Sequence, residues 1–283
     1  MSTLTEEISK RRTFAIISHP DAGKTTLTEK LLLFGGAIHI AGAVKSNKIK
    51  KTATSDWMEI EKQRGISVAT SVMGFNYGDY KINILDTPGQ FVFAAGLYEG
   101  INAAESVVIA LPAKEGVQVG TIKAYREAVK HGKTTMFVVT RMEEENSNFY
   151  KCLEELKTEF GPSICPIVVP FDKYGTVESY INLLEMKAYT YDNGVPTEVP
   201  MPASENRLKG LRAAMAEAVA ETDEELMMRY FENEGEDFTE AEIVKGLHDG
   251  IHKGYITPVV CCSGDTLAGI DMMLNTIIYM LPS

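Results

Sequence analysis

Residues 16–26 read IISHPDAGKTT, and this stretch decides the fold. It continues an apolar, β-branched run that begins at Phe14, and such a run predicts a buried strand. The residues GKTT at 23–26 then open an expected helix that extends to Phe34. A strand, a short loop and a helix in this order form the context that a phosphate-binding loop requires.

The residues of this loop have distinct expected roles. Backbone N–H groups at the start of a helix attract phosphate oxygens. We expect six residues to supply them: Asp21, Ala22, Gly23, Lys24, Thr25 and Thr26. Lys24 would reach the β- and γ-phosphates, and the Thr25 hydroxyl would ligate Mg²⁺. Ser18 stands where the Walker pattern has Gly, so an ordinary strand-to-helix turn is the alternative.

Composition limits the classes of protein to consider. The 283 residues are 45% hydrophobic and 24% charged, which predicts one or two globular domains. A net charge of −11 argues against general coating of nucleic acid, and we expect no DNA partner. We expect no membrane span and no signal peptide, because no apolar run is long enough and residues 1–12 are polar. The chain is therefore expected to be cytoplasmic, with reduced cysteines at Cys152, Cys165, Cys261 and Cys262.

Strand and helix patterns alternate along the chain. Expected strands lie at 68–77, 81–85, 106–111, 134–139 and 258–263, and expected helices at 118–131 and 267–281. This order predicts an α/β protein of the P-loop NTPase type, with a mostly parallel sheet and helices on both faces.

The gap between Thr140 and Pro258 is too long for one crossover connection. We therefore expect a nucleotide-binding domain at 1–160 and 256–283 and an inserted α+β subdomain at 161–255. In the insert we expect strands at 164–170 and 179–191, a hairpin turn at 192–194, a helix from about 204, and capping boxes that start further helices at Thr222 and Thr239.

Two further motifs point to a metal-bound phosphate. The sequence DTPG at 86–89 follows an expected strand, where Asp86 would hold Mg²⁺ through water and the Gly89 N–H would sense the γ-phosphate. Between this motif and the loop lies RGIS at 64–67, and Ser67 would supply a second hydroxyl to Mg²⁺. Each motif alone is also typical of an ordinary turn.

The chain resembles bacterial elongation factor G, in its first, nucleotide-binding domain, over nearly its whole length. Residues 61–67 and 18–26 look most like the release-factor branch of the same translational GTPases. Residues 186–191, 256–259 and 281–283 look like elongation factor G itself. The resemblance implies four further domains after this point, so we expect the chain to be a fragment or an excised domain.

The guanine-reading motif implied by the resemblance is degenerate. Asn-Lys-x-Asp is matched here by Thr140, Arg141, Met142 and Glu143. Glu143 keeps the charge on a longer side chain, Thr140 lacks the amide, and the stem of Arg141 would cover the base. The last base contact is matched by Ser263, Gly264 and Asp265. Each lost hydrogen bond to the base would cost roughly 1–3 kcal/mol.

The catalytic position also departs from the family. Translational GTPases carry His directly after Asp-Thr-Pro-Gly, and this chain carries Gln90. Gln orients the attacking water in small GTPases, so we assign Gln90 and Lys24 as the candidate catalytic residues. Asp21 matches the family position that binds a monovalent cation. We expect weakened hydrolysis or relaxed nucleotide choice, with an ordinary GTPase as the alternative.

The resemblance implies GTP or GDP with Mg²⁺ as ligands and the ribosome as partner, through ribosomal RNA and the stalk protein. The expected task is translocation or a related step of translation. A class-II release factor or a ribosomal protection protein is the first alternative, and the long insert argues against the release factor. A ribosome-binding module that holds nucleotide without turnover is the second. The lysine-rich residues 35–51 would be a solvated loop or an RNA contact.

Overall fold

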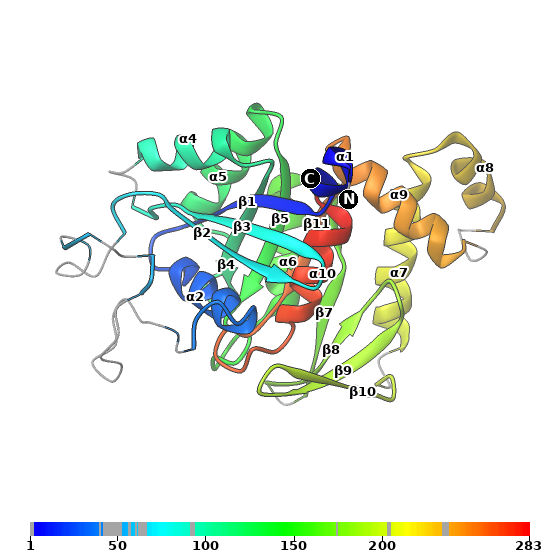
Figure 1. The fold of residues 1–283 in the computed structure, drawn as a ribbon. Helices are drawn as coiled ribbons and strands as arrows, with labels where there is room; N and C mark the ends of the chain where they lie inside the picture. The colour runs from blue at the N-terminus through cyan, green and yellow to red at the C-terminus, as the bar shows by residue number, and fades with distance from the viewer. Residues whose placement is uncertain are drawn as a thin grey trace.

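The structure is a computed structural model that describes residues 3–39, 41, 53–55, 58–59, 61, 67–90, 94–173, 175–202, 205–233 and 238–283. Its centre is a sheet of seven strands: β1 Arg11–Ser18, β2 Ser71–Tyr77, β3 Tyr80–Asp86, β4 Ser106–Pro112, β5 Thr134–Thr140, β6 Ile164–Pro166 and β11 Thr257–Cys261. The strand order is β2-β3-β1-β4-β5-β11-β6 (Figure 1). Only the β2–β3 pair is antiparallel among these pairings, so the mostly parallel sheet is confirmed.

The inner strands are apolar without alternation because both faces of the sheet are covered. All seven residues of β4 are buried, and so are Phe14–Ile17 in β1. Strand β2 lies at the edge of the sheet and alternates instead, with Val72 exposed and Phe75 buried. The burial pattern and the strand order place β1 inside the sheet, with the loop that follows it at the carboxyl edge of the strands.

Helices flank the sheet: α1 Leu4–Ser9, α2 Lys24–Phe34, α4 Ala94–Ala103, α5 Val119–Lys130, α6 Phe149–Phe160 and α10 Ile270–Met280. Figure 1 shows α2 and α10 in front of the sheet and α6 behind it, so both faces are covered as expected. The chain ends lie close together beside α1 (Figure 1). Among the described residues, no helix combines the length and apolarity needed to cross a bilayer.

A second, antiparallel sheet has the order β10-β9-β8-β7, formed by β7 Val168–Lys173, β8 Thr176–Asn182, β9 Lys187–Asp192 and β10 Val195–Val199. The single strand expected at 179–191 is therefore wrong: it is two strands joined by a turn in which Met186 has φ +52°. The expected hairpin turn at 192–194 joins β9 to β10, with Asn193 at φ +48° and Gly194 at φ +83°.

Three helices follow this sheet: α7 Glu205–Ala220, α8 Glu224–Asn233 and α9 Glu240–His252. The expected capping box at Thr239 is present, with Glu242 as its partner. The one expected at Thr222 is absent from this described segment. Its hydroxyl donates to the Val219 carbonyl, and Asp223 accepts the N–H groups at the start of α8 instead. Asp competes well for this position because its carboxylate accepts two N–H groups.

The expected start of the insert, at residue 161, does not coincide with the point where the chain leaves the central sheet. Strand β6 lies inside the range 161–255, yet it pairs in parallel with β11 as the last strand of the central sheet. The two sheets and the helices also share one hydrophobic core. The segment that leaves the central sheet therefore begins after Pro166, and the division into two domains stays a proposal.

Candidate nucleotide-binding site

The loop between β1 and α2 has the backbone of an anion-binding turn. Asp21 and Gly23 lie in the left-handed region, with φ +63° and φ +84°, and the Ala22 N–H donates to the His19 carbonyl. Such alternation turns successive N–H groups to one side. Gly23 caps α2 without a side-chain hydrogen bond, so the first N–H groups of the helix remain available to phosphate.

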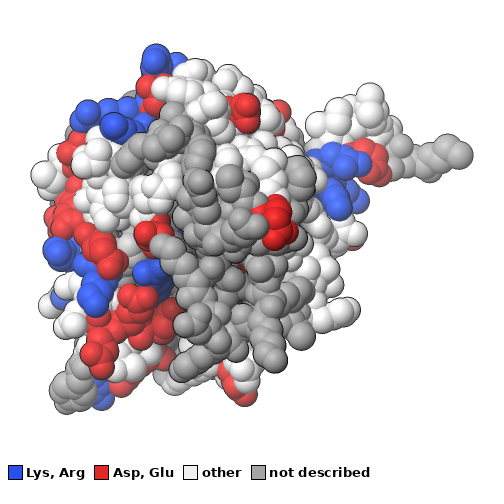
Figure 2. Space-filling model, turned by 90° about the vertical axis from the view of Figure 1, so that its left-hand side faces the viewer, with Lys and Arg blue, Asp and Glu red and all other residues white. Residues whose placement is uncertain are grey.

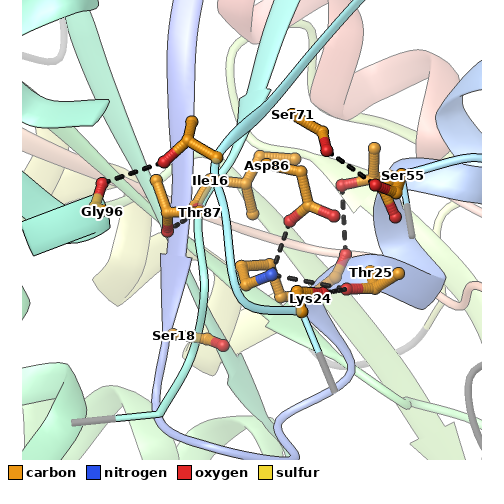
Figure 3. Close-up of polar contacts among 12 residues, drawn as sticks. Ile16, Ser18, Lys24, Thr25, Ser55, Ser71, Asp86, Thr87 and Gly96 are labelled. Atoms are coloured by element: carbon orange, nitrogen blue, oxygen red, sulfur yellow. Dashed lines mark hydrogen bonds and ion pairs between the residues drawn. The ribbon is translucent and has the colours of Figure 1, made fainter. Parts of the chain in front are cut away.

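Four residues from three separate segments meet beside this loop, and Figure 3 labels Lys24, Thr25 and Asp86 among them. Lys24 Nζ lies 2.5 Å from Asp86 Oδ1 and 3.4 Å from Thr25 Oγ1. The Thr25 hydroxyl is in turn 3.4 Å from the Ser67 hydroxyl. Lys24 and Asp86 are only 5% and 1% exposed, so the ion pair is buried. The structure therefore brings together the three residues that the sequence predicts as metal ligands.

The chemistry of this cluster fits Mg²⁺. The second carboxylate oxygen of Asp86, Oδ2, is buried and has no hydrogen-bond partner among the described residues. A buried carboxylate oxygen without a partner is costly. Mg²⁺ prefers oxygen ligands and keeps several of its waters, so one carboxylate and two hydroxyls suit it.

Asp86 is placed by the last pairing between β3 and β1. It lies opposite Ile16 in the parallel register, and Thr87 anchors the chain directly after it. The Thr87 hydroxyl donates to the Ile16 carbonyl at 2.8 Å (Figure 3). Gly100 of α4 permits this position, because a Cβ there would lie 2.4 Å from the Thr87 methyl group.

Gly89 and Gln90 continue from this anchor across the phosphate loop. A Cβ on Gly89 would lie 3.5 Å from Pro20 Cα, so the two segments are in contact. Gln90 borders a cavity of about 360 Å³ together with Ser18, Leu97 and Tyr98. This cavity opens beside the end of β1, which places the predicted catalytic residue next to the loop.

All of the predicted base-reading residues except Ser263 line a second cavity, of about 250 Å³, beside the first turn of α2. Its walls are formed by Gly23, Thr26, Leu27, Thr140, Arg141, Glu143, Glu144, Gly264 and Asp265. Thr140 ends β5, and Gly264 and Asp265 follow β11, the adjacent strand. The carboxyl ends of neighbouring parallel strands thus converge on one pocket, as expected for a ligand site in an open α/β sheet.

Two predicted base contacts are engaged elsewhere. The Thr140 hydroxyl is buried and donates to the Leu111 carbonyl at 3.4 Å, so it points back toward β4. The Ser263 hydroxyl is buried and accepts from the Thr266 hydroxyl at 2.7 Å. Ser263 therefore shapes the loop after β11 and is not among the residues that line the pocket.

Arg141 links the base pocket to the phosphate loop. Its guanidinium donates to the Asp21 carbonyl at 2.9 Å and lies 3.5 Å from Glu144. It also lies against Gly23, where a Cβ would come within 3.1 Å of Arg141 Nε. Asp265 closes the opposite side of the pocket, 3.7 Å from Lys30. Glu144 was not predicted, and only its place directly after the degenerate motif could have indicated it.

Burial raises the pKa of the cysteine thiols. Burial, and then the nearby Glu143 carboxylate, raise the pKa of Cys262. Burial raises the pKa of Cys152 and of Cys165 to about 12. All four cysteines are buried and free, which agrees with their expected place in the core. They supply no thiolate to the site.

Two parts of the expected site lie outside the described residues. They are Arg64–Ile66 of the RGIS motif and the lysines of the stretch before it, Lys45, Lys48, Lys50 and Lys51. Sequence reasoning also overlooked two buried carboxylates, Glu29 and Glu61. Both stand in polar stretches, which predict exposure.

Comparison with known proteins places this site in a family. Residues 9–283 match the family described as Elongation factor Tu GTP binding domain. Peptide chain release factor 3 of Symbiobacterium thermophilum is 46% identical over 193 residues, 68% of this chain and 37% of that protein. Peptide chain release factor 3 of Macrococcus caseolyticus is 37% identical over 282 residues, 99% of this chain and 52% of that protein. A crystal structure of a protein from Thermus thermophilus superposes with a TM-score of 0.88 at 34% identity, over 97% of this chain and 41% of that one.

The chain thus spans 37% and 52% of the length of these two curated relatives. The alignment with the Macrococcus caseolyticus factor covers 282 residues and so includes the expected insert. The insert therefore does not argue against a release factor, contrary to our expectation. The expected resemblance to translational GTPases, with their release-factor branch, is confirmed. The chain belongs to the family of the elongation factor Tu GTP-binding domain.

Proposed function

We propose that this domain binds GTP and GDP together with Mg²⁺ and serves a longer translation factor that acts on the ribosome. The observation that carries the proposal is the cluster of buried Lys24, Thr25 and Asp86 with half-buried Ser67 at the start of α2. It adjoins the pocket lined by Arg141 and other base-motif residues. Phosphate, metal and base would therefore meet around one helix N-terminus.

We expect each residue of the site to have one of the roles that phosphoryl transfer requires. Lys24 would contact the β- and γ-phosphates, with its ammonium held at the loop by Asp86. Thr25, Ser67 and Asp86 would hold Mg²⁺, which neutralises charge on the phosphate oxygens. The loop N–H groups would orient the phosphates, and the Gly89 N–H would detect the γ-phosphate. Gln90 would place the attacking water.

Gln90 makes slow hydrolysis the expected behaviour of this site. Its amide can orient a water, but it cannot become a cation as the family's His can. We therefore infer a weak response of turnover to the ribosome. A module that holds nucleotide on the ribosome without turnover is the second candidate, and it is favoured by the same residue together with the degenerate base motif.

The base pocket supports a relaxed choice of nucleotide. Thr140 offers no amide, and its hydroxyl is directed toward Leu111. Glu143, Glu144 and Asp265 bring three carboxylates to the pocket, which can accept hydrogen bonds from exocyclic amino groups of either purine. We infer weaker discrimination between guanine and adenine than an intact motif provides. A monovalent cation at Asp21 is part of the same proposal.

The named relatives favour peptide release as the task of the longer protein over translocation, and ribosomal protection remains an alternative. Figure 2 views the molecule from the left of Figure 1, and there Lys and Arg side chains are interspersed with Asp and Glu. Where the described residues form this face, their mixed charges create no broad attraction to RNA. Contacts with ribosomal RNA and the stalk protein would rest on local groups. A cytoplasmic location follows from this role.

Titration with labelled GTP and GDP tests the proposal. Lys24→Ala should weaken the binding of both nucleotides about 10- to 150-fold, because it removes a charged partner of the phosphates. Lys130→Ala is the matched control, since Lys130 is exposed on α5. Equal binding by wild type and Lys24→Ala would place the nucleotide elsewhere. Release of peptide and of phosphate on ribosomes, measured with the full-length protein, then tests the task.

A further inference from the structure

We infer that Glu61 is a positioning residue for Ser67 and thereby sets the preference of the site for a nucleoside triphosphate over a diphosphate. The inference rests on the proposed function and deepens it. It begins from a carboxylate that is 0% exposed although it stands in a polar stretch of the sequence.

The Glu61 carboxylate accepts hydrogen bonds from backbone N–H groups. One oxygen, Oε1, accepts from Val68 at 2.8 Å and from Ala69 at 3.2 Å. The other, Oε2, accepts from Met58 at 2.9 Å. Among the ion pairs of the described residues, none joins Glu61 to a Lys or Arg. Hydrogen bonds to a carboxylate are shorter and stronger than neutral ones, so this side chain restrains the backbone that it contacts.

The restrained backbone begins directly after Ser67. Two successive N–H groups, from Val68 and Ala69, point at the same Glu61 oxygen, which limits the orientation of the peptide that precedes them. The Ser67 hydroxyl reaches 3.4 Å from the Thr25 hydroxyl, the other candidate metal ligand. Glu61 itself is not among the groups that meet Lys24, so it acts through Ser67.

A second buried carboxylate, from Glu29, connects the nearby segment 53–55 to α2, the helix that follows the phosphate loop. Glu29 stands one helical turn after Thr25 and is fully buried, and it accepts from the Thr54 N–H. The Ser71 hydroxyl donates to the Ser55 carbonyl at 2.6 Å (Figure 3). Thr54 and Ser55, which precede Glu61 in the chain, are thus held against α2 and β2 near the site.

We expect Ser67 to contribute mainly to the binding of the triphosphate rather than of the diphosphate. Ser67 would hold Mg²⁺ together with Thr25, and Mg²⁺ would neutralise charge on the phosphate oxygens. Segments that carry such a hydroxyl ligand are ordered when γ-phosphate and Mg²⁺ are present. Lys24, Thr25 and the loop N–H groups serve both nucleotides. Displacing Ser67 should therefore weaken the triphosphate and leave the diphosphate nearly unchanged.

The test is Glu61→Gln, with Glu154→Gln as the matched control on the exposed face of α6. Gln keeps the shape, but its NH₂ group must face an N–H donor, so at least one charge-assisted hydrogen bond is lost. We expect the ratio of GTP to GDP affinity to fall about tenfold or more, with GDP affinity within about twofold of wild type. The Mg²⁺ concentration needed for half-saturation with GTP should rise in parallel.

The variant Ser67→Ala tests whether Glu61 acts by positioning Ser67 or only by stabilising the fold. It should lower the same ratio, and the double variant should lose little more than either single one, because the two residues act as a unit. A fall in GTP and GDP affinity by equal factors would show a merely structural role and overturn the inference. So would an unchanged ratio in Ser67→Ala, which decides the matter even if Glu61→Gln does not fold.

A failure of the proposed function would give a different result from a failure of the inference about Glu61. If Lys24→Ala retains wild-type affinity for both nucleotides, the site itself is misplaced. If Lys24→Ala loses both nucleotides while Glu61→Gln keeps the wild-type ratio, the site stands and only the role of Glu61 is wrong.

Discussion

Asp86→Asn should destabilise the nucleotide-free domain although it leaves the shape of the side chain intact. Lys24 is 5% exposed and Asp86 is 1% exposed, and their charged atoms lie 2.5 Å apart. Breaking one partner of a buried pair leaves an uncompensated charge, which costs about 3–5 kcal/mol. Little of this is screened by solvent, because neither side chain reaches the surface.

The expected fall in Tm follows from the size of the chain. With an unfolding entropy of about 2.1 cal/mol/K per residue, 283 residues convert 3–5 kcal/mol into a fall of about 5–8 °C. Thermal unfolding of nucleotide-free protein, followed by circular dichroism at neutral pH, measures it. Asp79→Asn is the control, because it removes the same charge from an exposed turn between β2 and β3.

A double variant, Lys24→Met with Asp86→Asn, completes this experiment. It removes both charges and should recover most of the lost Tm, because no buried charge is left unpaired. The reasoning is refuted if Asp86→Asn melts within about 1 °C of the Asp79→Asn control. That result would mean that water already solvates the Lys24 ammonium and that the pair contributes nothing.

Three further outcomes are expected. Thr140→Asn combined with Glu143→Asp should raise the affinity for GTP and leave the affinity for ATP nearly unchanged in competition titrations. A wild-type domain that already binds GTP about four orders of magnitude more tightly than ATP, about 5.5 kcal/mol, contradicts this. Gln90→His should raise ribosome-dependent phosphate release by the full-length protein at saturating GTP, whereas strong stimulation of the wild type would show that Gln serves as well. The hydrogen bond from Arg229 lowers the pKa of Glu242 to about 2, so its contribution to stability is present above the ordinary carboxylate pKa and is lost as pH falls from about 4.5 toward 2. Glu242→Gln should flatten that part of the curve of Tm against pH.

Composition and local pattern are enough to predict most of the central sheet and the phosphate loop. Long apolar runs such as Phe14–Ile17 and the seven residues of β4 are buried on both faces, so their composition identifies them without further context. The loop is local as well, since residues 18–26 form it alone. The resemblance to the family implied that Arg141 and Asp265 belong to one site, and both line the same pocket, since the carboxyl ends of neighbouring parallel strands lie at one edge of the sheet.

Other features could be seen only in the folded chain, because local composition does not encode them. Strand β6 is three residues long, and it joins the central sheet because β11, some ninety positions later, offers it a free edge. Ser263 turns away from the pocket because Thr266 donates to its hydroxyl. Glu61 is charged and stands in a polar stretch, so local composition predicts exposure. Its burial is tolerated because the backbone N–H groups of Met58, Val68 and Ala69 satisfy the carboxylate, and this convergence depends on how the segment folds, which its composition does not reveal.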